Sequence, residues 1–324
     1  MRTQLNAALF KCMARTLASR WNPENKVASL YFHHIHRKGR DPFSPDDLDI
    51  PELESLIEVL RQHFFFIGAD EELPTHAPAI MLTFDDGYLD NREAAAFLED
   101  IGIKANFFIA SAGMEKGFLW QDVLSRSFKI DDKEALRITK EIAGDLNVKL
   151  GHIPIKRNGD EKSAARTFHE VASYVKYWAP HAVDELESAL VELFGVPYRC
   201  MLQENEVHEI SRRGHVIGAH THNHRILTTL TKEEAIDEVM RSKEGLESAT
   251  FKPVKCFAYP NGAPQKDFTE RDVEIVKNAG FSCAYTTQDG GISANTDPYQ
   301  RGRFLPYRRH PLLRAMSTIK IAGE

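Results

Sequence analysis

The sequence predicts an α/β fold built on a parallel sheet. Short apolar runs of strand length alternate along the chain with longer segments whose apolar residues recur at helical spacing. The run at residues 79–82 is apolar without interruption, as expected for a strand covered on both faces. Strands that alternate with helices usually pair in parallel, because each helix returns the chain to the starting edge of the sheet.

The chain before this run supplies two expected helices and one strand. The first 21 residues carry apolar side chains at roughly helical spacing, interrupted by four basic residues. This N-terminal helix (residues 1–24) lacks the continuous apolar core of a signal peptide. It is expected to pack on the main domain (residues 25–324) or to be a frayed end, and the alternative is a basic amphipathic helix on a membrane surface. A strand at 27–33 ends in His33-His34-Ile35-His36, where a histidine could line a site or belong to a structural loop. A helix at 51–62 follows.

The later elements repeat the strand and helix alternation. Capping boxes mark two of the helices, at Thr231-x-x-Glu234 and at Thr269-x-x-Asp272. Gly280 is expected just after the second of these helices. In chain order we expect a helix at 91–100, strands at 105–109 and 216–219, a helix at 231–247, a strand at 254–258, a helix from 269, and a strand at 283–287.

Composition and charge exclude several classes of protein. Apolar residues make up 42% and charged residues 27% of the 324 residues, as in ordinary globular proteins. The net charge of −6 gives no electrostatic reason to expect nucleic acid as a partner. No stretch is long enough to span a bilayer. Four cysteines without disulfide spacing favour a reducing compartment, so we expect a cytoplasmic protein, with peripheral contact to the inner face of the membrane through the N-terminal helix as an option.

Two adjacent carboxylates follow the apolar run at residues 79–82, in the segment Thr83-Phe84-Asp85-Asp86-Gly87-Tyr88. A buried strand that ends in a charged pair is a common way to build a site at the carboxyl edge of a sheet. Side chains alternate along a strand, so Asp85 and Asp86 should point in different directions, one towards a metal and one towards the reacting atom. The alternative is a strand end followed by an Asp-Gly turn.

Three histidines lie within five residues after the expected strand at 216–219. His220 and His224 are four residues apart, so one helical turn or a tight loop could place both on one ion. His222 falls on the other side in either geometry and is expected to contact the site from outside or to lie at the surface. The alternative is a polar loop with incidental histidines, but this spacing favours a metal site.

These two stretches together resemble motifs of the polysaccharide deacetylases, the NodB-homology domain of carbohydrate esterase family 4. The segment Phe257-Ala258-Tyr259-Pro260 resembles the third motif in one branch of that family, and 279–287 resembles its late helix and strand. The resemblance covers roughly residues 27–311 and implies a distorted (β/α) barrel. Residues from about 113 to 205 are an expected helical insertion that could cover the site and stack on sugar rings. The aromatic residues of the insertion are Trp120, Tyr174, Tyr177 and Trp178. Aromatic residues in a helical insertion more often form its own core than a binding surface.

The resemblance also implies roles for individual residues. Asp86, His220 and His224 would bind a divalent metal, with Zn²⁺ expected and Co²⁺ or Ni²⁺ compatible with the same ligands. Asp85 would be the general base. The backbone N–H of Asn261 would stabilise the oxyanion that forms at the acetyl carbon.

Two positions depart from the family pattern. Ala258 replaces an arginine that orients the base in the main branch, and Arg303 is the expected substitute, with Arg308 and Arg309 as rivals. The late Leu-x-His motif that supplies the family's general acid has no clear copy. His310 lies in the matching region and is the expected acid.

The sequence therefore predicts a metal-dependent hydrolase that removes an N-acetyl (or O-acetyl) group from a sugar or polysaccharide. Two alternatives remain open. One is a cytoplasmic deformylase or deacylase of a lipid-linked sugar. The other is a carbohydrate-binding relative with little catalytic activity, which the missing arginine and the uncertain acid would favour.

Overall fold

The structure is a computed structural model that describes residues 27–36, 41–44, 48–62, 64–74, 78–151, 153, 161–303 and 305. The expected N-terminal helix at residues 1–24 lies outside the described residues, as do Arg308, Arg309 and His310. Among the helices that the structure describes, none is long and apolar enough to cross a membrane.

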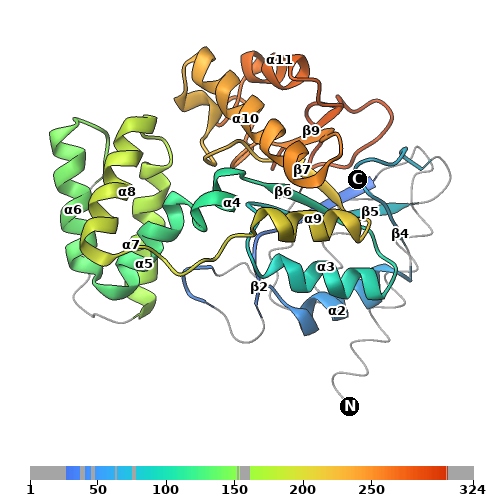
Figure 1. Cartoon of the computed structure of the whole chain (residues 1–324), viewed down its shortest axis with the longest axis horizontal. Helices are drawn as coiled ribbons and strands as arrows, with labels where there is room; N and C mark the ends of the chain where they lie inside the picture. Colours follow the sequence, from blue (N-terminus) through green and yellow to red (C-terminus); the bar gives the residue numbers. More distant parts are fainter. Residues whose placement is uncertain are drawn as a thin grey trace.

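A curled parallel sheet forms the centre of the molecule (Figure 1). The strand order is β1-β5-β6-β7-β8-β9, and β4 pairs with β5. The predicted α/β fold class is confirmed, because parallel strands form a curled half-barrel that helices surround. The strands are β1 (Val27–Phe32), β4 (Phe65–Phe66), β5 (Ala79–Phe84), β6 (Asn106–Ile109), β7 (Val216–Ala219), β8 (Cys256–Ala258) and β9 (Cys283–Tyr285).

The gap between the two edge strands is bridged by the chain after β9. Val27 of β1 pairs with Ile292 in an antiparallel bridge, and Tyr285 of β9 pairs with Arg301 in a parallel one. The segment 286–303 therefore runs along the open side of the half-barrel. This path carries Arg303 to the carboxyl end of β5, where it contacts Asp85.

The two faces of the sheet have different packing partners. On the outer face, side chains such as Leu82 and Phe257 pack with the apolar faces of the surrounding helices. On the inner face, Met81, Phe108 and Tyr285 form a separate cluster that fills the curl. The surrounding helices are α2 (Ile50–Leu60), α3 (Asn91–Asp100), α9 (Glu204–Arg212), α10 (Lys232–Thr250) and α11 (Glu270–Asn278), with a short 3₁₀ turn η1 (Leu227–Thr229) before α10.

Helix boundaries follow their caps. The expected helix at 51–62 runs from Ile50 to Leu60 because Asp49 caps it, accepting a hydrogen bond from the Glu52 amide at 2.8 Å. Both capping boxes expected from the sequence are present, at Thr231 and at Thr269. A small two-stranded sheet, β2 (Ile35–His36) and β3 (Leu48–Asp49), lies beside α2.

The chain between β6 and α9 forms a helical lobe with its own hydrophobic core (Figure 1). We call helices α4 to α8 and their connections the insertion. Trp120 and Trp178 are buried in its core, so these two aromatics are structural. Its helices are α4 (Ala112–Lys116), α5 (Trp120–Ile130), α6 (Asp132–Asp145), α7 (Glu161–Val175) and α8 (Pro180–Phe194).

Candidate metal centre

The carboxyl ends of four strands of the same sheet bring the predicted site residues to one rim. Asp85 and Asp86 follow β5, and His33 follows β1. His220 follows β7, and Asn261 lies three residues after the end of β8. Parallel pairing places all these strand ends at the same edge of the sheet, where α/β proteins usually build their sites.

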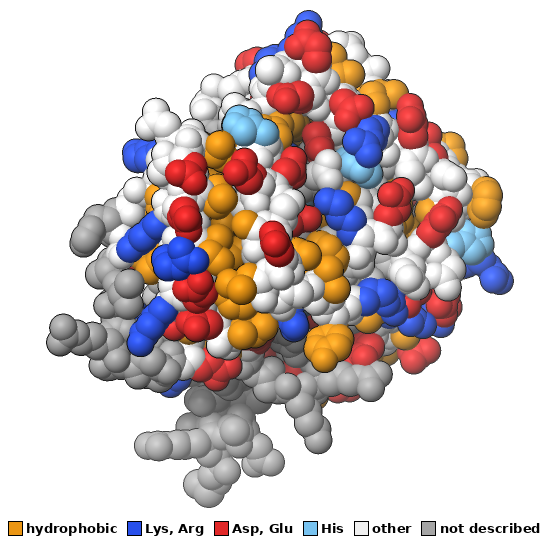
Figure 2. Space-filling model, turned by 60° about the vertical axis from the view of Figure 1, so that its left-hand side comes forward, with side chains coloured by type: hydrophobic (Ala, Val, Ile, Leu, Met, Phe, Trp, Pro, Cys, Tyr) orange, Lys and Arg blue, Asp and Glu red, His pale blue; other side chains and the backbone are white. Residues whose placement is uncertain are grey.

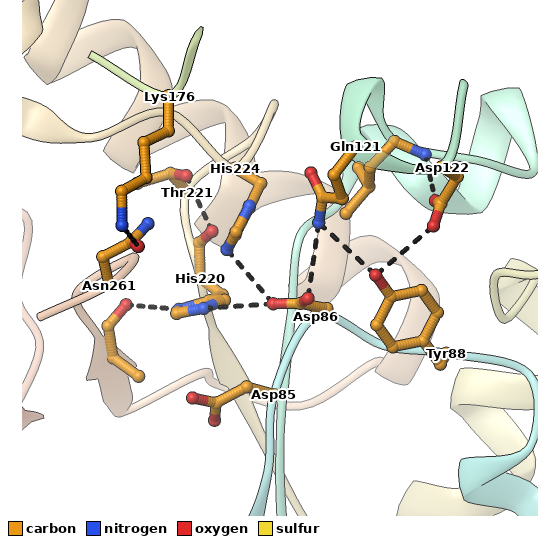
Figure 3. A network of polar contacts seen from close by, with 12 residues as sticks. Asp85, Asp86, Tyr88, Gln121, Asp122, Lys176, His220, Thr221, His224 and Asn261 are labelled. Carbon is orange, nitrogen blue, oxygen red and sulfur yellow. Dashed lines mark hydrogen bonds and ion pairs between the residues drawn. The ribbon is translucent and has the colours of Figure 1, made fainter. Parts of the chain in front are cut away.

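Asp86, His220 and His224 converge on one point (Figure 3). The Nε2 atoms of His224 and His220 lie 3.1 and 3.4 Å from Oδ1 of Asp86. One ligand atom from each residue lies within 4.8 Å of the other two. Nδ1 of His220 lies 2.7 Å from the carbonyl oxygen of Ala258. Donation to this carbonyl fixes the proton on Nδ1 and leaves the Nε2 lone pair facing the cluster, as in many metal sites.

The chemistry of these three groups fits a divalent cation. Oδ1 of Asp86 is buried without a hydrogen-bond partner among the described residues, although two imidazoles face it. Burial opposes ionisation of Asp86, but the charge of His224 and the closeness of both imidazole rings outweigh it and hold the pKa of this carboxyl well below its usual range. An anionic oxygen and two imidazole nitrogens are the donor set that zinc, cobalt or nickel binds.

Left-handed backbone conformations orient two of the three groups. Asp86 has a φ of 73° and His224 a φ of 56°, and Gly87 follows at 90°. A Cβ atom on Gly87 would lie 2.7 Å from a methyl carbon of Ile109, so the turn after Asp86 requires glycine. Non-glycine residues in this region are energetically unfavourable and concentrate at functional sites.

Asp85 points in a different direction from Asp86 and binds Arg303. The guanidinium donates two hydrogen bonds to the carboxylate, at 2.7 and 2.8 Å, and Arg303 is fully buried. Burial opposes ionisation of Asp85, but the adjacent charge of Arg303 outweighs it and lowers the pKa of the carboxyl. Arg303 also donates to Thr83 Oγ1 at 3.0 Å and to the carbonyl of Thr286 at 3.2 Å. These contacts hold Asp85 ionised in one orientation.

Asn261 lies in a tight turn with a φ of 58°. Its carbonyl accepts a hydrogen bond from Thr287 Oγ1, and its side-chain Oδ1 accepts one from Lys176 Nζ at 2.7 Å. No acceptor for its backbone N–H occurs in the described part of the chain. That N–H is therefore available to a ligand oxygen, the role predicted for it.

The insertion contacts the site at two points that no sequence motif indicated. Gln121 Nε2 lies 3.4 Å from Oδ2 of Asp86 and 3.4 Å from the hydroxyl of Tyr88. Lys176, in the turn after α7, reaches Asn261, and burial lowers the pKa of this lysine. The neighbouring Tyr177 donates to Asp267 at 2.7 Å. Of the four aromatics expected to form the insertion's core, Tyr177 instead contacts the barrel.

His33 is a site residue to which the sequence analysis assigned no definite role. It lines the same cavity as Asp86, and its charge adds a small contribution to the lowered pKa values of Asp85 and Asp86, behind burial and the nearer partners. Its ring nitrogens have no hydrogen-bond partner within the described ranges. The neighbouring His34, in contrast, pairs with Asp90 at 2.9 Å and stacks on Tyr88. In the sequence, the histidine run at the end of the expected strand at 27–33 was the feature that pointed to His33.

His222 contacts other residues, as expected for a histidine outside the ligand set. Its Nδ1 lies 2.7 Å from Ser111 Oγ, and its Nε2 lies 2.7 Å from Arg241 Nη2. Burial and the charge of Arg241 lower the pKa of this imidazole, so it accepts a hydrogen bond from the guanidinium as a neutral ring. The expected acid His310 and the rival arginines lie outside the described residues.

A cavity of about 550 Å³ opens beside the cluster. Asp86, Tyr88 and His33 line its barrel side, while Gln121, Asp122 and other residues of α5 and α7 line its opposite side. This volume lies within the range of small-molecule binding sites. The metal centre therefore borders a cavity that the barrel and the insertion build together.

Comparisons with known proteins agree with this architecture. The family model "Polysaccharide deacetylase" matches residues 156–284, a range that contains His220, His224 and Asn261 but starts after the two aspartates. Among solved structures, the Streptococcus pyogenes deacetylase PplD is similar with a TM-score of 0.56 and 16% identity, over 91% of this chain and 98% of that one. IcaB from Ammonifex degensii gives the same TM-score and identity, over 91% and 97%.

A third structure, the de-N-acetylase from Aggregatibacter actinomycetemcomitans, has a TM-score of 0.52 and 14% identity, over 87% of this chain and 95% of that one. No curated protein matches the chain. At these identities the structural likeness establishes the fold. The family-model match and the shared fold together confirm the resemblance to the polysaccharide deacetylase family that the sequence motifs predicted.

Proposed function

We propose that the protein is a metal-dependent hydrolase that removes an acetyl group from a sugar, most simply an N-acetyl group. The observation that carries this proposal is the different surroundings of two adjacent carboxylates. Asp86 faces two imidazoles, while Asp85 is held by Arg303 at 2.7 and 2.8 Å. The family match, and the description of two of the similar structures as deacetylases, support the same reaction.

Asp86, His220 and His224 would hold the metal. When bound there, a divalent ion such as Zn²⁺ acidifies a water molecule and polarises the acetyl carbonyl. Zinc suits two imidazoles and one carboxylate best, and cobalt or nickel would occupy the same donors.

Residues of the chain would carry the proton transfers and stabilise charge. Asp85, kept ionised by Arg303, accepts the proton of the attacking water. The N–H of Asn261, for which the described residues offer no acceptor, donates to the acetyl oxygen as negative charge develops on it. His33, which lines the cavity without a hydrogen-bond partner in the described part of the chain, donates a proton to the leaving nitrogen. His310, the acid expected from the sequence, lies outside the described residues, and His33 is the candidate that the described part of the chain offers.

The test compares metal content with turnover in three variants. Elemental analysis after incubation with Zn²⁺ should find one ion per wild-type chain and almost none in His224→Ala. Asp85→Asn should keep the ion and lose acetate release from N-acetylglucosamine oligomers by about 10³-fold or more, since a general base and its charge are both removed. His181→Ala, at an exposed position of α8, is the matched control and should behave like wild type.

Two results would refute the proposal. One is wild-type protein without stoichiometric metal after incubation with Zn²⁺ or Co²⁺. The other is Asp85→Asn with turnover close to that of wild type. A metal-loaded wild type that binds sugars but releases no acetate would favour the carbohydrate-binding alternative.

A further inference from the structure

The cavity beside Asp86 extends outward along α5 to a positively charged side chain. Arg126 lines the cavity, and its Nε donates to the carbonyl of Phe194 at 3.3 Å. Its guanidinium lies over the ring of Tyr198, 5.7 Å from the centroid. No carboxylate pairs with Arg126 among the described residues. In contrast, Lys129 of the same helix is paired with Asp41 at 2.6 Å. Arg126 is therefore a cation available to a ligand anion.

Exposed hydrophobic side chains surround this arginine. Ile130 lies one helical turn after Arg126 and is 55% exposed, and Tyr198 is 88% exposed. Both line the cavity. Leu193 and Val196, which flank the Phe194 carbonyl bound by Arg126, are 53% and 59% exposed. Figure 2, in which the insertion is turned towards the viewer, shows hydrophobic side chains gathered among charged ones. We call these four residues the apolar rim.

The order of these features matches one class of molecule. Asp86 of the metal centre, Arg126, and Ile130 and Tyr198 of the apolar rim line the same cavity. Asp86 is buried, Arg126 is half-buried and the apolar rim is exposed, so exposure to solvent increases from the metal centre through the arginine to the apolar rim. An uncharged polysaccharide would leave both the cation and the apolar rim without a partner. Exposed apolar side chains grouped beside a ligand cavity are typical of a contact surface.

We propose that the substrate is an acetylated sugar joined through a phosphate to a hydrocarbon chain. The sugar occupies the cavity, Arg126 binds the phosphate, and the apolar rim contacts the first part of the chain. This inference rests on the proposed function and names the substrate class for the same site. It favours the lipid-linked member of the alternatives that the sequence left open.

The binding test uses decyl phosphate, which carries the phosphate and the chain but no sugar. Calorimetry on the zinc-loaded protein should show that decyl phosphate binds at least about tenfold more tightly than inorganic phosphate, because several methylenes are buried. Arg126→Gln should weaken binding of decyl phosphate about tenfold, since a hydrogen bond to a charged group is lost. Tyr198→Ser should weaken decyl phosphate but not inorganic phosphate. Arg166→Gln, at an exposed position of α7 outside the cavity, is the control.

The turnover test uses N-acetylglucosamine 1-phosphate as its decyl ester and as its methyl ester, and methyl N-acetylglucosaminide. Acetate release should fall in that order, and Arg126→Gln should affect only the two phosphate compounds. Equal binding of decyl phosphate by wild type and Arg126→Gln, or no binding by wild type at about 1 mM, would overturn the inference. Intact, Arg126-dependent binding without any acetate release would support the lipid-phosphate site and refute the hydrolase proposal, so the two failures are distinguishable.

Discussion

The barrel rim and the insertion both contact Asp86, but they do so in different ways. On the rim, the partners are buried and the contacts are short, as in the bidentate pair of Asp85 with Arg303. From the insertion, Gln121 reaches Asp86 at 3.4 Å, and Lys176 reaches the turn at Asn261 from a partly buried position. The rim holds the charged groups of the site in place, whereas the insertion adds longer contacts to them and encloses the cavity.

The difference follows from how each part is built. Rim residues lie at the ends of strands whose register is fixed by the pairing of β1, β5 and β6, so their positions are set by the sheet. The insertion has a hydrophobic core of its own and meets the site through the start of α5 and the turn after α7. Its contribution to the site depends on how two separate cores are packed together.

Removing Arg303 should produce the largest effect. Arg303→Met leaves the buried carboxylate of Asp85 without its partner, which should lower the free energy of unfolding by about 3–5 kcal/mol. Acetate release should be lost as well, because Asp85 is no longer held ionised in one orientation. Urea denaturation monitored by circular dichroism measures the first effect.

The double variant Asp85→Asn/Arg303→Met provides the control for this prediction. Removing both charges should restore most of the lost free energy of unfolding while activity stays absent, since the uncompensated charge is the source of the instability. An Arg303→Met variant as stable as wild type would show that the pair is not the buried ion pair described above.

Much of the rim could be predicted from the sequence because its residues lie in short motifs next to recognisable strands. Asp85, Asp86, His220 and His224 follow apolar runs, and the runs became strands. Arg303 was harder to assign, because it is 218 residues from its partner and depends on how the chain closes the half-barrel. His33 was noted only as part of a histidine run, since nothing in the sequence showed which histidine faces the cavity.

Substitution of His33 should affect turnover without affecting the metal. His33→Gln keeps a polar side chain of similar reach but cannot donate a proton as an acid, so the rate of acetate release should fall about 10²–10⁴-fold. Zinc content and thermal stability should stay near wild type, because the ring has no hydrogen bond to lose among the described residues. Steady-state kinetics and elemental analysis on the same preparation check both statements.

The result for His34 would sharpen this assignment. His34→Gln removes the contact with Asp90 and the stacking on Tyr88. It should therefore lower stability more than His33→Gln does while retaining more activity. The reverse pattern would show that the wrong histidine has been assigned to the proton transfer.

The insertion could be predicted only as a helical segment. Its helices and core follow from apolar periodicity, and Trp120 and Trp178 are buried in that core as expected. Gln121 and Lys176 carried no signal, because a single polar residue at a helix start or in a turn looks the same whether it faces solvent or a metal ligand. Only the packing of the insertion against the barrel gives these residues their contacts.

Substitution of Gln121 should produce the smallest of the three effects and tests whether the insertion belongs to the metal site at all. Gln121→Leu removes the amide that faces Oδ2 of Asp86 at 3.4 Å. Groups that orient a metal ligand usually contribute 10- to 100-fold to metal affinity, and this long contact should give the lower end, about tenfold. Competition with a zinc chelator measures the change, and Gln62→Leu, at an exposed position near the end of α2, is the matched control.

Because Asp86 keeps both histidines in Gln121→Leu, stoichiometric metal should still bind at saturating Zn²⁺. Unchanged zinc affinity in Gln121→Leu would mean that the rim alone defines the metal centre and that the insertion only encloses the cavity.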